Sequence, residues 1–275
     1  MSHQSKDEYY APQQKSSGYA PPGGGADKDQ QYEILEAGLV HNVNPSEIPA
    51  AGAWNSNADI EKALRLGFIR KVYGILSIQL LLTAVVAAIC MYNDRVRQGV
   101  LANPWCFHLG FFVSIALLIC LMCFRNKYPM NMYLLGAWTF VEAYTIGVVC
   151  ASFASQGQGT IVVQAAGLTM AVFLGLTLFT FQTKIDFSFL GGALFAGLWI
   201  LMLWGLAMSI IGYQQSYLYS LVGAIIFSLY ILYDTSLLMN RLGYDEYIAA
   251  SISLYLDIIN LFLFMLRLLS SSRNR

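Results

Sequence analysis

The sequence has 275 residues, of which 57% are hydrophobic and only 12% are charged. Soluble globular proteins carry about 25% charged residues, so this composition and a mean hydropathy of +0.54 exclude an ordinary water-soluble domain and indicate a membrane protein. The formal net charge is +0, which gives no indication of nucleic acid as a partner.

The first 58 residues differ in composition from the rest of the chain. They include the stretch YYAPQQKSSGYAPPGGGADKDQQY, which is rich in Pro, Gly, Gln, Ser and Tyr and offers little to bury. Such a composition predicts a disordered cytosolic tail over residues 1–58. The tail suits either a ligand for a small recognition domain or a solvated segment without a dedicated partner. Because it is polar, we expect no cleavable signal peptide.

Residues 59–71 (DIEKALRLGFIRK) follow as an amphipathic lead-in, with Asp59 as the predicted N-cap of a helix. Seven apolar runs come next, each about as long as the 20 residues that span a bilayer as a helix. Backbone groups in lipid must be hydrogen bonded within the chain, so each run is predicted to be helical. The connections are short, which predicts one all-α, seven-helix transmembrane bundle over residues 72–269. The runs are 72–91, 105–124, 130–153, 160–181, 187–212, 217–239 and 247–266.

Lys and Arg residues in the loops predict the orientation of the bundle. An excess of Lys and Arg marks the cytosolic side of a membrane protein, so the N-terminus is predicted to be cytosolic. The last run allows two interpretations: it crosses the membrane, or it enters and returns on one side. We predict a crossing, because residues 247–266 have full spanning length. The side of the N-terminus collects Arg125, Lys127, Lys184 and Arg241, whereas Arg95 and Arg97 lie on the other side.

Two further patterns concern packing. The segment GGALFAG (191–197) spaces small residues four apart, which predicts close contact with another helix. Cys120 and Cys123 have the spacing of a redox or zinc motif, but no second Cys or His pair completes a metal site. We therefore expect these two cysteines to be buried apolar residues.

Three acidic side chains lie well inside the predicted spans, namely Glu142, Asp234 and Asp257. An Asp at the centre of a membrane helix costs roughly 2.5–3.5 kcal/mol. No Lys or Arg lies within the spans as predicted, so ion pairing inside them cannot offset this cost. The acids must then be protonated, share a proton, or bind a cation.

Asp234 and Asp257 lie on the last two runs, which a short turn connects. Counted from that turn, their depths are about 9 and 14 Å, within reach of each other by helix tilt and side-chain length. Two carboxylates in a medium of low dielectric constant cannot both ionise cheaply. A shared proton would hold the helices together at low pH, and at higher pH the pair would separate or take up a cation. Ca²⁺ suits this site because it prefers oxygen ligands.

The spacing of nearby polar residues extends this hypothesis. Ser253 and Asn260 share a helix face with Asp257, and Tyr230 lies one turn before Asp234. Together with Glu142, these residues are candidates for an ion path, with Asp234 and Asp257 as a transient calcium site. No cofactor is expected beyond calcium as the permeant ion. The alternative is that the acids are protonated and only hold helices together.

Three segments resemble the transmembrane Bax inhibitor motif family: KYPMNMYLLGAWTFVEAYTIG (127–147), LYILYDTSLLMNR (229–241) and DEYIAASISLYLDIINLFLFMLRLL (245–269). The resemblance covers roughly residues 60–270 and is best to the lifeguard and Golgi anti-apoptotic branches. It implies a seven-helix protein of the endoplasmic reticulum or Golgi that leaks calcium in a pH-sensitive way and suppresses cell death. It also implies that Asp234 and Asp257 form the gate and that Glu142 belongs to the ion path.

Two other functions remain open. The first is a non-conducting regulator in the lipid bilayer that binds Bcl-2-type proteins or a calcium-release channel. The second is an intramembrane aspartyl protease, since two neighbouring Asp residues can activate water. Such enzymes carry Gly-x-Gly-Asp at their second aspartate, whereas this chain has Leu-Tyr-Leu before Asp257. We therefore expect no enzymatic activity.

Overall fold

The structure is a computed structural model that describes residues 57–212 and 217–273. The predicted tail lies outside these residues, except that residues 57 and 58 begin the first helix. The described chain holds seven helices that are long and apolar enough to cross a membrane. The prediction of an all-α, multi-pass membrane protein is therefore confirmed. All seven lie mainly in one compact unit, Ile60–Arg275, to which the description below refers.

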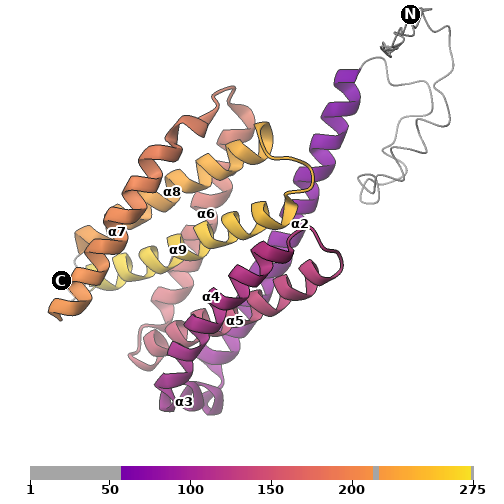
Figure 1. Ribbon diagram of the computed structural model, residues 1–275. Helices are drawn as coiled ribbons and strands as arrows, with labels where there is room; N and C mark the ends of the chain where they lie inside the picture. Colours follow the sequence, from indigo (N-terminus) through magenta and orange to yellow (C-terminus); the bar gives the residue numbers. More distant parts are fainter. Residues whose placement is uncertain (1–56, 213–216, 274–275) are drawn as a thin grey trace, which may run out of the picture. The chain divides into compact units, whose positions relative to one another are not determined.

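The helices follow one another with short connections (Figure 1). The elements are α2 (Asn57–Tyr92), α3 (Asp94–Ala102), α4 (Pro104–Phe124), α5 (Met130–Ser155), α6 (Gly159–Gln182), the short 3₁₀ helix η2 (Phe187–Leu190), α7 (Gly191–Ile211), α8 (Tyr217–Asn240) and α9 (Tyr247–Arg273).

The ends of several helices differ from the apolar runs that the sequence predicts. The lead-in at 59–71 and the first run form one continuous helix, α2, because charged side chains at its start lower its hydropathy but leave its helical backbone intact. The first loop contains α3, whose N-cap Asn93 accepts hydrogen bonds from the backbone N–H groups of Arg95 and Val96. At the other end, α9 continues to Arg273, so Arg267 lies within it.

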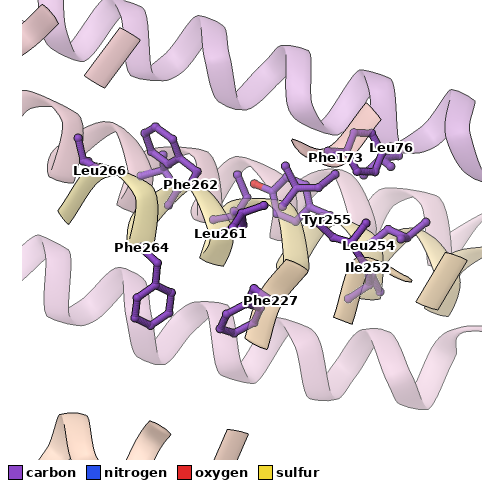
Figure 2. Close-up of a cluster of buried hydrophobic side chains, with 14 of the residues drawn as sticks. Leu76, Phe173, Phe227, Ile252, Leu254, Tyr255, Leu261, Phe262, Phe264 and Leu266 are labelled. Carbon is purple, nitrogen blue, oxygen red and sulfur yellow. The ribbon is translucent and has the colours of Figure 1, made fainter. Parts of the chain in front are cut away.

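Helix α9 is the central element of the bundle. In its most apolar stretch 67% of the residues are buried, compared with 11% in α4 and in α7. It packs against α8 and α6 (Figure 1). Phe264 of α9 stacks on Phe227 of α8, with ring centroids 5.7 Å apart (Figure 2). Side chains on α9 are therefore in contact with neighbours on most of its circumference.

The expectation that Cys120 and Cys123 are buried is wrong. Both are exposed on α4, where only Ser114 and Leu121 are buried. An apolar residue in a membrane helix can face either lipid or protein, and composition does not distinguish the two. The two cysteines lie on a helix at the edge of the bundle, so they face outward.

Candidate functional site

The carboxyl groups of Asp234 and Asp257 lie within hydrogen-bonding reach of each other, where α8 packs against α9. Asp257 is only 5% exposed, and Asp234 is half-buried. Neither carboxyl forms an ion pair with any residue that the structure describes. One oxygen of Asp257, Oδ2, has no hydrogen-bond partner in the described chain. A buried, unpaired carboxylate oxygen is costly, so the geometry fits a proton shared between the two groups.

Of the other three residues predicted for this site, two lie near the acid pair and one does not. Ser253 is exposed, and its hydroxyl lies within hydrogen-bonding reach of Asp234. Tyr230 lies near both carboxyls and interacts with them electrostatically. Asn260 instead donates its side-chain N–H to the backbone carbonyl of Leu256, at 2.8 Å within its own helix. Ser253 and Tyr230 thus lie beside the acid pair, whereas the side chain of Asn260 is bonded to the backbone of its own helix.

Glu142 lies in a separate polar cluster between α4 and α5. Its carboxylate accepts a hydrogen bond from the hydroxyl of Ser114, which in turn accepts one from Trp138 Nε1 at 3.2 Å. Thr145 donates to the backbone carbonyl of Glu142 at 2.8 Å. Sequence reasoning did not find Ser114 as the partner of Glu142. The signal was available, because Ser114 is a lone hydroxyl in an otherwise apolar run.

Two more buried polar contacts connect α2 to α5 and to α9, and sequence reasoning missed both. Gln79 donates to Thr139 of α5 at 3.0 Å. Thr83 and Tyr255 of α9 share a hydrogen bond of 2.8 Å. Gln79 and Thr83 are one helical turn apart, a spacing that places both on the same face of α2. These contacts show that the polar interior of the bundle extends beyond the acids.

Outside the spans, Asp186 is bound to the end of α8. Its carboxylate accepts hydrogen bonds from Arg241 at 2.8 and 3.1 Å and caps η2 by accepting from the backbone N–H of Ser188. The Arg241 guanidinium, and after it the Ser188 N–H, lower the pKa of Asp186 to about 2. Asp186 is therefore ionised throughout the physiological range of pH and cannot act as a pH sensor there.

A stable metal centre is not evident in the described part of the chain, which contains no group of three or more His, Cys, Asp or Glu side chains placed to hold a metal ion. The paired carboxyls of Asp234 and Asp257 offer four oxygens in total. Ca²⁺ takes six to eight oxygen ligands, so these groups could provide only part of its coordination. That arrangement suits a site that a cation occupies briefly.

Comparison with known proteins identifies the family. Residues 65–274 match the family described as inhibitor of apoptosis-promoting Bax1. The chain belongs to the Bax inhibitor motif family. The match begins within α2 and includes the six later spanning helices that the structure describes, together with Glu142, Asp234 and Asp257. The resemblance seen in the sequence motifs is confirmed.

Similar members of the Bax inhibitor motif family come from distant sources. The Golgi anti-apoptotic protein of vaccinia virus (strain Lister) is 42% identical over 80% of this chain and 92% of its own length. Protein lifeguard 4 of Mus musculus is 42% identical over 76% of this chain and 86% of its own length. Bax inhibitor 1 of Schizosaccharomyces pombe is 34% identical over 85% of this chain and 88% of its own length. The chain is thus a multi-pass membrane protein of an anti-apoptotic family.

Proposed function

We propose that this protein is a pH-sensitive calcium leak of an intracellular membrane, which lowers the stored calcium and so suppresses cell death. The observation that carries the proposal is the contact between Asp234 and the buried carboxyl of Asp257. Intramembrane acids without a basic partner are costly and mark ion pathways or proton relays. The contact provides a place where either a proton or a cation can balance the charge.

The acid pair works as a gate because its charge depends on pH. With one shared proton, the two carboxyls are linked and α8 is held against α9. When both are ionised, two unit charges 4 Å apart repel by about 4 kcal/mol at an effective dielectric constant near 20. That repulsion is relieved by separation of the carboxyls or by a divalent cation between them. Protons and Ca²⁺ then compete for one site.

The exposed hydroxyl of Ser253 lies at the Asp234 side of this pair. It gives a cation a polar contact on the way from the surface of the bundle to the buried Asp257. Glu142, with its own cluster on α4 and α5, is the next acid along the proposed path. In this scheme Ca²⁺ is the permeant ion, and no cofactor takes part.

The test is calcium flux into proteoliposomes that contain the purified chain, measured at several pH values between about 5 and 8. We expect a flux that depends on pH in the wild type, and loss of that dependence in Asp234→Asn, Asp257→Asn and the double variant. Asp245→Asn is the matched control, because Asp245 is an exposed acid of the α8–α9 turn outside both helices. A flux that is the same in wild type and double variant would refute the proposal.

The names of the relatives favour a second candidate, a non-conducting regulator that binds Bcl-2-type proteins or a calcium-release channel. The name of the vaccinia virus relative refers to apoptosis and to the Golgi, and that of the Schizosaccharomyces pombe relative refers to inhibition of Bax. We propose that the protein lies in the Golgi or endoplasmic reticulum, and that its N-terminus is in the cytosol because the Lys and Arg residues of the loops favour that side. Cells that express the double Asn variant distinguish the two functions. Protection from cell death that persists without calcium leak would favour the regulator.

A further inference from the structure

Tyr255 of α9 projects from the side of that helix that faces away from the acid pair. It is completely buried. Its hydroxyl bonds to Thr83 of α2 at 2.8 Å, and its ring meets Trp138 of α5 edge-on, with centroids 5.4 Å apart and an angle of 70°. Figure 2 shows Tyr255 in the middle of the buried side chains along α9. The ring is therefore held by contacts from two other helices.

The direction of the hydrogen bond follows from the contacts of Thr83. Thr83 donates its only hydroxyl hydrogen to the backbone carbonyl of Gln79, at 2.9 Å. Its oxygen must therefore accept the second hydrogen bond, so Tyr255 is the donor. Loss of the Tyr255 hydroxyl would leave Thr83 with its own donor group still bonded. Tyr255→Phe is for that reason a mild change that keeps the ring in place.

Tyr255 and Asp257 point to opposite sides of α9. Residues two positions apart on a helix are separated by about 200° around its axis. The carboxyl of Asp257 meets Asp234 of α8, whereas the ring of Tyr255 meets α2 and α5. Tyr255 also lies close enough to Glu142 to interact with it electrostatically. Helix α9 thus has one acidic site on each side, and Tyr255 lies beside the second.

We propose that Tyr255 closes the path between the acid pair and the polar cluster around Glu142, and that its hydrogen bond to Thr83 holds the ring across that path. This inference rests on the proposed calcium leak. The acid pair sets how often a cation is bound, through its competition with protons. The Tyr255 ring sets how often a bound cation passes, because a cation has to displace it to reach Glu142. The two effects therefore multiply.

The experiment compares calcium flux in proteoliposomes for wild type, Tyr255→Phe and Thr83→Val. Removal of a hydrogen bond with a net value of about 0.5–1.5 kcal/mol is expected to raise the flux about two- to tenfold at every pH, without moving the pH at which the flux changes. Tyr133→Phe loses a hydroxyl from an exposed site on α5 and should leave the flux unchanged. Thr83→Ser keeps the acceptor and should also behave as wild type.

The outcomes separate this inference from the proposed function. If the wild-type flux depends on the acid pair but Tyr255→Phe and Thr83→Val leave it unchanged, Tyr255 does not close the path and the leak stands. If the wild type carries no flux, both proposals fall. Thermal unfolding of each variant shows whether it is folded, and Tyr255→Phe provides the decisive result where Thr83→Val is too unstable. A shift of the pH dependence in Tyr255→Phe would also contradict the separate roles given to the two sites.

Discussion

Gly223 of α8 allows the close approach of α8 and α9, and replacing it with Ala provides a sharp test of that packing. A Cβ atom at this position would meet the ring of Phe264 well inside van der Waals contact. The ring has little room to move, because it stacks on Phe227 on one side and contacts Tyr219 at a centroid distance of 5.6 Å. Gly223→Ala should therefore push the two helices apart.

The magnitude follows from two opposing effects. Overpacking of a well-packed interior costs about 1–3 kcal/mol, while Ala in place of Gly favours a helix by about 0.8–1 kcal/mol. Gly175→Ala is the matched control, since it gains the same helix propensity at an exposed position of α6 with no atom near the new Cβ. The variant should thus be about 1–3 kcal/mol less stable than the control. For a chain of this size, each kcal/mol lowers Tm by roughly 2–4 °C.

The assay is thermal unfolding in detergent, followed with a thiol-reactive fluorescent dye. Cys90 and Cys150 are free and buried, so they react when the bundle opens, while the exposed cysteines give the starting signal. Phe264→Leu added to Gly223→Ala should recover part of the loss, because a smaller side chain makes room for the methyl group. Equal Tm values for Gly223→Ala and Gly175→Ala would refute the close approach of α8 and α9.

Two further predictions concern the acids outside the pair. Asp186 contributes stability that is complete above its ordinary pKa of 3.8 and is lost as the pH falls through about 2. Arg241→Gln should therefore move acid unfolding to higher pH without changing the flux profile between about pH 5 and 8, and a changed profile in that range would contradict the assignment. Glu142→Gln should keep the fold, because an amide oxygen can still accept from Ser114, yet lower the calcium flux. A Glu142→Gln protein with unchanged flux would remove this residue from the ion path.

The positions of the spans could be predicted from the sequence because length and hydropathy are local properties. The contact between Asp234 and Asp257 could be anticipated in the same way, since both depths are counted from one turn. The sequence did not predict that the lead-in and the first span form one continuous helix, α2. Arg65 and Lys71 lower the hydropathy of a segment that nevertheless remains helical. Arg65 donates a hydrogen bond to the backbone carbonyl of Leu242, just after the end of α8, and this contact stabilises its charged side chain within the bundle.

The sequence did not predict which neighbours the individual side chains of a helix contact. The small residues of segment 191–197 predict a close helix contact, and Gly191 makes one, because a Cβ there would lie 2.8 Å from the Tyr233 hydroxyl of α8. Nothing lies within 4 Å of a Cβ at Gly192, however, and Gly197 has only an ordinary contact with Ile226. Among the glycines that the structure describes, the tightest approach is at Gly223 of α8, outside that segment. Asn260 has the right spacing for the acid pair but bonds to its own backbone. Side-chain direction depends on neighbours that are distant in sequence.

The position of α9 in the centre of the bundle suits the proposal that one helix serves two separate steps. Its burial on most sides makes it costly to move, because packed interiors resist small displacements. A change at Asp257 should therefore displace α8 more readily than α9. A change at Tyr255 should likewise displace the side chains of α2 and α5 that contact it. The acid pair and the tyrosine then influence each other only through a helix that stays in place. Effects of substitutions on the two sides should accordingly add in free energy, as they do for sites that share no partners.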